Sequence, residues 1–188
     1  LTIGDLVIFE STVYPGTTME VCVPILESSG LSLNKDFGVA YSPERVSPGG
    51  DKKVRDISKI ISASSEKYLP IVRSIYEAVV DAELHVAPSI LVAEASKVFE
   101  NVQRDVNIAL INEFAVICDR LGISTSDVLA AASTKWNFVP FRPGLVGGHC
   151  ISVDPYYLIS RASALGVPAN LMINAREVNE GMVDFVAE

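Results

Sequence analysis

Cys150 stands in a glycine-rich loop whose residue types favour thiol chemistry. The loop belongs to the segment GLVGGHCISVDPYYL, residues 144–158, and the neighbours that matter for chemistry are Gly147, Gly148, His149 and Asp154. Paired glycines let a backbone approach a ligand closely and adopt positive φ angles. A thiol becomes a good nucleophile when it is exposed and close to positive charge, which stabilises the thiolate. We therefore predict that Cys150 is a reactive nucleophile.

The other two cysteines have a different setting. Cys22 and Cys118 occupy apolar positions of amphipathic helical patterns, so we expect both to be buried structural residues. The cysteine count is odd and no C-x-x-C pair is present, so the sequence predicts neither a disulfide framework nor a metal site. This cysteine usage favours a reducing, cytoplasmic location.

A polar stripe runs along a helical pattern further up the chain. Lys97, Asn101 and Arg104 are spaced four and seven residues apart, which places the three side chains on one helix face. Such a stripe supplies cationic and amide donors for a developing oxyanion or a bound phosphate. The competing interpretation is an ordinary solvated polar face.

Two further candidates follow predicted strands. Thr12 lies in the sequence EST and Glu44 in YSPER, each just beyond a strand end. Ligands of open α/β sheets gather beyond the carboxyl ends of the strands, so both residues are expected to face one crevice. The competing interpretation is loop capping by the threonine and a surface glutamate.

The bulk composition excludes some functions. The 188 residues carry a formal net charge of −8 and no basic run, which argues against a nucleic-acid partner but not against a small anionic ligand. No apolar run reaches about 18 residues, so no membrane span is predicted.

The elements that must position these residues change in kind near Pro88. The first half predicts parallel strands at 6–11, 36–43 and 82–87 with helices at 17–29 and 64–80, an order typical of the end of an open α/β sheet. Residues 89–121 then contain no glycine or proline and predict one helix of about 33 residues, spanning roughly 50 Å.

The second half is expected to be all helical. Ser89 is a suitable N-cap for the long helix and Gly122 a suitable stop. A short helix is predicted at about 124–133, a loop at 134–156 and a helical stretch from about 156 to the end. We therefore predict two domains, residues 1–87 and 88–188. The first residue is not Met and the last residues read as mid-helix, so we also expect the chain to be a fragment of a longer protein.

Four ordered segments carry a family resemblance. They are STVYPGTT (11–18), YSPERVSPG (41–49), KVFENVQRDVNIALINE (97–113) and FRPGLVGGHCISVDPYYL (141–158). In this order they resemble the NAD-dependent UDP-glucose/UDP-mannose dehydrogenase family, whose members oxidise the C6 alcohol of a nucleotide-linked hexose to a carboxylate. The GGHC loop and the DPYYL run are most similar to the branch that acts on UDP-N-acetylmannosamine or UDP-N-acetylglucosamine in polysaccharide biosynthesis. Ser152 departs from this pattern, since proline is common there.

The resemblance implies a role for each candidate residue. Cys150 would attack the C6 aldehyde and pass through a thioester, and Lys97 and Asn101 would stabilise the oxyanions. Asp154 and Thr12 would position or activate the hydrolytic water, and Glu44 would assist proton transfer. The residues implied in NAD binding are Ser11, Thr12 and Glu44. The residues implied in substrate binding are Lys97, Asn101, Arg104, Arg142, Gly147, Gly148 and His149.

The resemblance also implies an architecture. It predicts the end of a Rossmann-like parallel sheet domain, followed by a helical central domain like that of 6-phosphogluconate dehydrogenase, which would form a homodimer through the long helix. The family's G-x-G-x-x-G turn is absent from this sequence. We therefore expect little NAD affinity and no activity from the isolated chain.

Three alternatives remain open from the sequence. One is a UDP-glucose 6-dehydrogenase, against which His149 argues by resemblance. A second is a helical dimerisation module without chemistry of its own. A third is a related hydroxyacid dehydrogenase, which needs one hydride transfer and has no use for the thiol.

Overall fold

The computed structural model describes residues 1–46 and 50–187 and divides into two compact units. The first unit is Leu1–Val98 and the second is Phe99–Glu188. Each unit is described by itself below. The division between the units falls inside one long helix, Ile90–Leu121. The domain boundary at residue 87, which the sequence predicted, stays a prediction.

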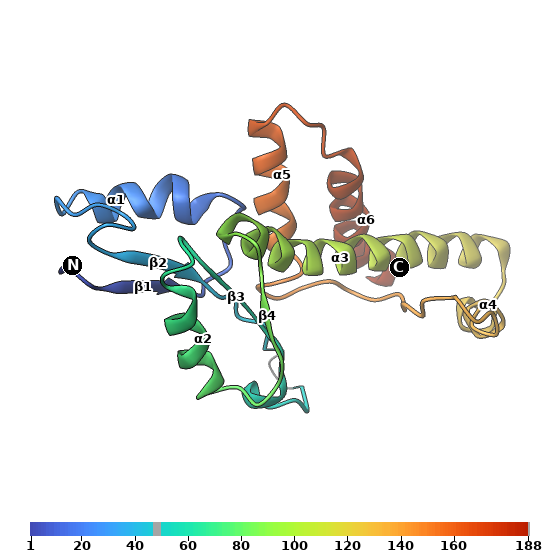
Figure 1. The fold of residues 1–188 in the computed structure, drawn as a ribbon. Coiled ribbons are helices and arrows are strands. Elements are labelled where there is room, and N and C mark those ends of the chain that lie inside the picture. Colours follow the sequence, from blue (N-terminus) through green and yellow to red (C-terminus); the bar gives the residue numbers. More distant parts are fainter. Residues whose placement is uncertain (47–49, 188) are drawn as a thin grey trace. The chain divides into compact units, whose positions relative to one another are not determined.

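The first unit is built on a four-stranded mixed sheet (Figure 1). Its strands, in the order β1-β2-β3-β4, are β1 Leu6–Phe9, β2 Gly38–Tyr41, β3 Lys59–Ala63 and β4 Leu84–Val86. The pair β1–β2 is parallel, as expected, and β3–β4 is also parallel, but β2–β3 is antiparallel, so the sheet is not the purely parallel one that the sequence predicted. The sequence predicted three strands, whereas the sheet among the described residues has four. Strand β3 was missed because its five residues are flanked by serines and polar turns rather than by a long apolar run.

Both faces of this sheet are covered, which explains the continuous apolar strands. On β2, Val39 and Tyr41 face one core, and Ala40 faces the other. The first core includes Val23 of a helix and Ala93. The helical elements of this unit are η1 Thr18–Cys22, a π-helical turn, then α1 Val23–Glu27, η2 Val54–Asp56 and α2 Leu69–Glu77. The predicted helices at 17–29 and 64–80 are thus correct in kind and shorter than expected.

The long helix is confirmed as α3, Ile90–Leu121. The hydroxyl of Ser89 accepts a hydrogen bond from the backbone N–H of Val92 at 3.2 Å, so it caps the first turn. Gly122 has φ +67°, a conformation that ends a helix with little strain for glycine alone.

The second unit continues with three helices, α4 Thr125–Ala132, α5 Asp154–Ala164 and α6 Asn170–Ala187. Ser124 caps α4 by accepting from the N–H of Asp127 at 3.3 Å. The single helical stretch expected after residue 156 is instead two helices. Gly166, at φ +71°, and Pro168 separate them, because this glycine ends α5 and the proline cannot continue it.

None of the helices within residues 1–46 and 50–187 has the length and apolarity needed to cross a membrane.

Candidate active site

The thiol loop, residues 144–153, presents Cys150 as an exposed free thiol. The carbonyl of Cys150 accepts hydrogen bonds from the backbone N–H groups of Asp154, at 2.9 Å, and of Val153, at 3.3 Å. Gly148 has φ +86°, and its carbonyl accepts a short bond from the hydroxyl of Ser152. The cysteine therefore lies in a tight turn that leads into α5. The glycine requirement predicted for this loop is confirmed at Gly148.

Among the predicted site residues, Asn101 and Asp154 lie in direct contact. Nδ2 of Asn101 donates to Oδ2 of Asp154 at 2.6 Å, and both side chains are buried. They are 53 residues apart in sequence, and Asp154 is the first residue of α5. The contact brings an amide donor of α3 and the carboxylate beside the thiol loop into one polar cluster.

The predicted stripe on α3 is only partly a solvated face. Lys97 is 9% exposed and Asn101 4% exposed, although both are polar, whereas Arg104 is exposed. Burial of polar groups is costly unless they are paired, so polar residues at two successive turns of this face are unusual for a surface helix. The burial of Lys97 and Asn101 therefore weighs against the simpler interpretation of the stripe.

The first unit contains the remaining predicted residues, Ser11, Thr12 and Glu44. Strands β1 and β2 are parallel neighbours, so the segments that follow them emerge at the same edge of the sheet. The hydroxyl of Tyr41 donates to the carbonyl of Ser11 at 3.1 Å, which ties the two strand ends together. Thr12 is half-buried and Glu44 exposed. The predicted motif YSPERVSPG extends over residues 47–49, which lie outside the described residues.

Glu44 is held by its own loop. Its Oε1 accepts from the backbone N–H groups of Arg45, at 2.7 Å, and Val46, at 2.6 Å. Its Oε2 lies 3.7 Å from Nζ of Lys59, which extends from β3. A carboxylate at this edge is therefore oriented by both backbone donors and a cation.

Lys59 belongs to a small charged cluster that the sequence did not predict. Its buried ammonium lies 3.0 Å from Oε1 of Glu10 and 5.1 Å from the ring centroid of Tyr76, whose hydroxyl donates to the same Oε1 at 2.8 Å. Partial burial opposes ionisation of Glu10, but the bonds from Tyr76 and Lys59 outweigh it and lower the pKa of this carboxyl. Burial, and the same bond to Glu10, raise the pKa of Tyr76 well above its ordinary value.

The loop after β1 is anchored by a second unpredicted carboxylate. Glu94 of α3 is fully buried, and its carboxylate accepts hydrogen bonds from three donors. They are the N–H of Gly16 at 2.6 Å, the N–H of Thr18 at 2.8 Å and the hydroxyl of Thr18 at 2.6 Å. This loop contains Thr12, so Glu94 fixes the chain that carries a predicted site residue.

A chain of buried polar side chains was also missed. Asp105, Asn112, Arg176 and Asn179 are almost fully buried and hydrogen-bonded to one another between α3 and α6. The signal that could have found Asn112 is a polar residue beside Ile111 in an apolar stretch of helix. Cys118 is buried, as expected, whereas Cys22 is partly exposed and the expectation for it was wrong.

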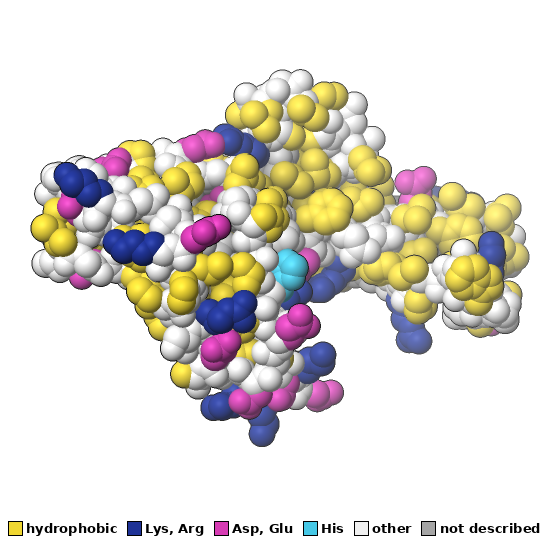
Figure 2. Space-filling model, viewed as in Figure 1, with side chains coloured by type: hydrophobic (Ala, Val, Ile, Leu, Met, Phe, Trp, Pro, Cys, Tyr) yellow, Lys and Arg dark blue, Asp and Glu magenta, His cyan; other side chains and the backbone are white. Residues whose placement is uncertain are grey.

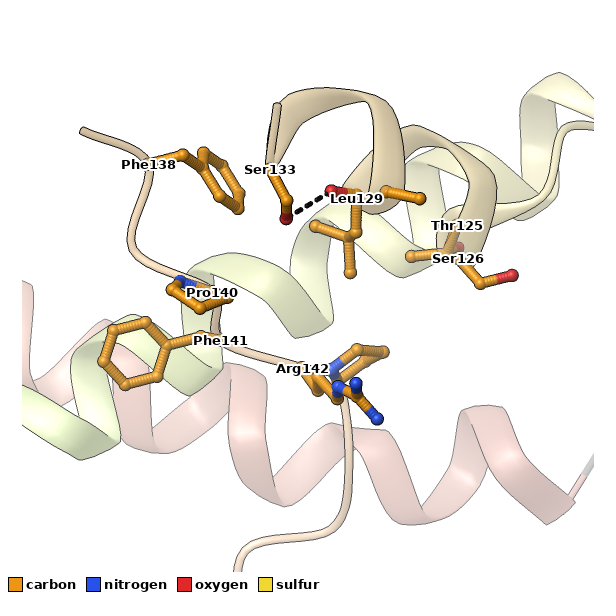
Figure 3. Close-up of a pocket in the computed structure, with 10 residues that line it drawn as sticks. Thr125, Ser126, Leu129, Ser133, Phe138, Pro140, Phe141 and Arg142 are labelled. Atoms are coloured by element: carbon orange, nitrogen blue, oxygen red, sulfur yellow. Dashed lines mark hydrogen bonds between the residues drawn. The ribbon is translucent and has the colours of Figure 1, made fainter. Parts of the chain in front are cut away.

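Two of the cavities among the described residues lie within the second unit, and neither of these two is lined by Cys150. One, of about 400 Å³, lies between α4 and residues 138–143. Figure 3 shows Arg142 on its loop side and Thr125 and Ser126 on its α4 side. The other, of about 430 Å³, is an apolar groove that includes Phe99, Leu158 and Met172. Within the part of the chain that the structure describes, no group of three or more His, Cys, Asp or Glu side chains is arranged to hold a metal ion.

The predicted residues are thus distributed over both units. The first unit contains Ser11, Thr12, Glu44 and Lys97. The second contains Asn101, Arg104, Arg142, Gly147, Gly148, His149, Cys150 and Asp154.

Comparison with known sequences gives two matches to domains of a single family. The NAD binding domain of the UDP-glucose/GDP-mannose dehydrogenase family matches residues 1–80, and the central domain of the same family matches residues 91–181. The chain is 55% identical over 185 residues to UDP-N-acetyl-D-glucosamine 6-dehydrogenase of Pseudomonas aeruginosa, covering 97% of this chain. It is 53% identical over 188 residues to the enzyme of the same name from Salmonella typhi, covering 98% of this chain. The chain spans 44% of the length of each of these relatives.

Comparison with solved structures also gives a match to a UDP-sugar dehydrogenase. UDP-D-ManNAc dehydrogenase from Pyrococcus horikoshii superposes with a TM-score of 0.89 at 39% identity, covering 100% of this chain and 44% of that one.

Proposed function

We infer, since the chain belongs to the UDP-glucose/GDP-mannose dehydrogenase family, that the whole protein is an NAD-dependent UDP-sugar 6-dehydrogenase. The reaction we propose is four-electron oxidation of the C6 hydroxyl of a UDP-N-acetylhexosamine to a carboxylate, in nucleotide-sugar metabolism for polysaccharide biosynthesis. The observation that carries this proposal is the bond between Asn101 and Asp154, which joins the polar stripe of α3 to the exposed thiol loop.

Cys150 would do the covalent chemistry. After the alcohol has been oxidised to the aldehyde, the thiolate adds to C6 and forms a thiohemiacetal. Loss of a second hydride from C6 gives a thioester, and water then cleaves the carbon–sulfur bond to release the carboxylate and restore the thiol. The exposure of Cys150 and its place in a glycine turn support this role.

Lys97 and Asn101 would stabilise negative charge on the C6 oxygen. A cation and an amide donor one turn apart on a helix can both face an oxygen, and their burial strengthens such interactions relative to water. Asp154 accepts from the amide of Asn101 and so keeps one carboxylate oxygen engaged. We propose that this carboxylate orients the hydrolytic water, that Thr12 assists it, and that Glu44 takes part in proton transfer.

We propose that NAD binds at this edge of the sheet. Ser11, Thr12 and Glu44 follow parallel neighbouring strands at their carboxyl ends, where α/β sheets bind such ligands, and hydroxyl and carboxylate groups suit ribose hydroxyls. NAD bound there would supply the hydride acceptor. Because no G-x-G-x-x-G turn is present in these 188 residues, we propose that the chain by itself binds NAD weakly and is inactive.

The substrate class is proposed from the relatives and from the loop sequence. Two relatives above 50% identity are named for UDP-N-acetylglucosamine and a solved neighbour for UDP-ManNAc. Arg142, Arg104 and residues 147–149 supply the cationic and flexible groups that we assign to the diphosphate and sugar.

Assay of the whole protein with UDP-N-acetylglucosamine, UDP-N-acetylmannosamine and UDP-glucose tests the proposal. We expect two NADH per sugar with an N-acetylhexosamine and much lower kcat/KM with UDP-glucose. A preference for UDP-glucose would change the substrate class, and one NADH per turnover would point to a hydroxyacid type of dehydrogenase instead.

A homodimer through α3 is the assembly we propose, in a cytoplasmic protein. Exposed apolar residues lie on one face of the part of α3 in the second unit, at Phe99, Leu110, Ile117 and Leu121. Figure 2 shows apolar side chains along this part of the helix and over α4. An exposed apolar stripe on a long helix supports association with a second copy, because isolated apolar patches of this kind are uncommon on monomers.

A further inference from the structure

The thiol loop begins at a glycine whose peptide groups are held by a buried amide. Oδ1 of Asn112 accepts from the N–H of Gly144 at 2.8 Å, and Nδ2 of Asn112 donates to the carbonyl of Gly144 at 3.0 Å. A side-chain amide therefore pairs with the main chain of one residue through both its donor and its acceptor. Asn112 is fully buried on α3, whereas Gly144 is exposed. Without the amide, Gly144 would be free to turn to solvent.

The orientation of the Asn112 amide is set by the hydrogen bonds behind it. Its Nδ2 also donates to Oδ1 of Asn179 at 2.8 Å. Nδ2 of Asn179 in turn donates to the carbonyl and to Oδ1 of Asp105, at 3.0 and 2.7 Å, and Arg176 donates to that Oδ1 at 2.6 Å. The carbonyl and Oδ1 of Asp105 accept these bonds, so they fix the orientation of the Asn179 amide, and Asn179 in turn fixes that of Asn112.

The other end of the thiol loop is held by the same helix. Asn101 donates to the side chain of Asp154 at 2.6 Å, and the N–H of Asp154 donates to the carbonyl of Cys150. Asn101 and Asn112 are eleven residues apart, which is three turns of helix or roughly 16 Å and returns to the same face. Gly144, at the start of the ten-residue loop, and Asp154, directly after it, thus bond to side chains on one face of α3.

We propose that Asn112 is a positioning residue for Cys150. It fixes the start of the thiol loop as Asn101 fixes its end, so that the thiol keeps one place relative to the Asn101–Asp154 pair. This inference rests on the proposed thiol chemistry and deepens it. A misplacement of about 1 Å at a reacting group can lower a rate by roughly 100-fold, so an anchor remote from the thiol matters for turnover.

The first test acts from the exposed side of the contact. Gly144→Pro removes the backbone N–H that donates to Oδ1 of Asn112, whereas Gly144→Ala keeps this donor. A Cβ at this position meets no atom within 4 Å, and the φ of Gly144 lies outside the left-handed region, so the alanine is tolerated. In the whole protein we expect Gly144→Pro to lower kcat by about 10-fold to 100-fold, while KM for the UDP-sugar changes less than about 3-fold and Gly144→Ala behaves as the wild type. Equal kcat values for the two variants would overturn the proposal.

The second test acts from the helix. Asn112→Ala is compared with Asn107→Ala, because the amide of Asn107 donates to the carbonyl of Gln103 in its own helix. The readout is hydrogen exchange of the amides of Val153 and Asp154, which donate to the carbonyl of Cys150. We expect both to exchange about 10-fold faster in Asn112→Ala and in Gly144→Pro, and unchanged in the two controls.

The two tests separate this inference from the proposed function. Unchanged exchange at Val153 and Asp154 would mean that Asn112 holds Gly144 alone, which overturns the positioning role and leaves the thiol chemistry standing. Normal turnover by Cys150→Ser would remove the chemistry without altering the exchange result. If Asn112→Ala fails to fold, the Gly144 pair decides, since that residue lies at the surface.

Discussion

The carboxylate of Glu94 lies at the N-terminal end of the helix that starts at Thr18 and accepts from both the N–H and the hydroxyl of that residue. A negative charge is favourable there, because the first N–H groups of a helix lack partners within it and the helix dipole is positive at this end. The contact spans 76 residues of sequence and joins α3 to the chain that follows β1.

Glu94→Gln is expected to destabilise the protein. The substitution keeps the shape but turns an amide N–H₂ toward donors, so we expect a loss of about 2–3 kcal/mol in the free energy of unfolding. Urea denaturation of both forms measures the loss. Glu113→Gln, on an exposed position of the same helix, is the matched control and should change little. A loss below about 0.5 kcal/mol for Glu94→Gln, the range of ordinary surface changes, would contradict the assigned role.

Cys150→Ser is expected to abolish net four-electron turnover in the whole protein. A serine hydroxyl is a far weaker nucleophile than a thiolate at neutral pH, so reaction should stop at the aldehyde stage or as an ester-like adduct. NADH release per sugar, measured in a single turnover, checks this. Cys22→Ser serves as the control. Normal steady-state turnover by Cys150→Ser would exclude the thioester mechanism.

Asp154→Asn is expected to slow thioester hydrolysis more than oxidation. The change removes the carboxylate proposed to orient water, so kcat should fall by about 100-fold, within the range typical for loss of a general base. Intact-mass analysis during turnover should show the sugar bound to the protein through Cys150. Asp184→Asn, at an exposed position of α6, should show no adduct. A fall in activity with no adduct would mean that Asp154 acts before the thioester forms.

Tyr76→Phe is expected to have an effect that depends on pH. The pKa of Glu10 in the folded state lies below its ordinary value of 4.5, so the stability from its ionised form is present above that value. It is lost as pH falls through the folded pKa. The substitution removes a donor to Glu10, whose side chain is 50% exposed, so the loss at neutral pH should stay below about 1 kcal/mol and shrink as pH falls below 4.5.

Urea denaturation at several pH values measures this difference for Tyr76→Phe and for the control Tyr157→Phe. A loss that stays constant between neutral pH and the acid range would mean that the bond to Glu10 contributes nothing.

Leu110→Asp is expected to weaken self-association. Leu110 is 64% exposed at the centre of the apolar stripe on α3, and a carboxylate placed in an apolar interface is costly to desolvate. Light scattering should show a dimer for the wild type and a shift toward monomer for the variant. Leu165→Asp, 65% exposed just after α5, is the control. A wild-type monomer at tens of micromolar would contradict the dimer directly.

Local sequence signals predicted the parts of this fold that depend on local physics. The long helix was predicted to within one residue because it lacks breakers and has a serine cap and a glycine stop. The site motifs were recognisable because glycine, cysteine and aspartate at fixed spacing constrain one loop.

The parts that were missed depend on partners far away in sequence. Strand β3 is defined by its pairing with β2 and β4. The end of α5 at Gly166 was not predicted, because the sequence patterns on both sides of this glycine are helical.

The same reasoning explains the missed site residues. Glu94 and Asn112 look like ordinary polar residues of a long helix, and only their partners at Thr18 and Gly144 reveal what they hold. Conversely, Asn101 and Asp154 were each predicted, and the structure added the hydrogen bond that joins them. The residue types therefore predicted which side chains could take part in chemistry, but the hydrogen bonds between residues far apart in sequence became visible only in the structure.

The unequal exposure of the three thiols makes Cys150 a natural attachment point for a reporter. Cys118 is buried and Cys22 partly covered, whereas the Cys150 sulfur belongs to an exposed residue. A maleimide fluorophore or spin label added briefly under native conditions should therefore modify mainly one position, without any engineered cysteine. Its signal would follow the loop in real time, and the same accessibility makes Cys150 the first thiol at risk when peroxide is present.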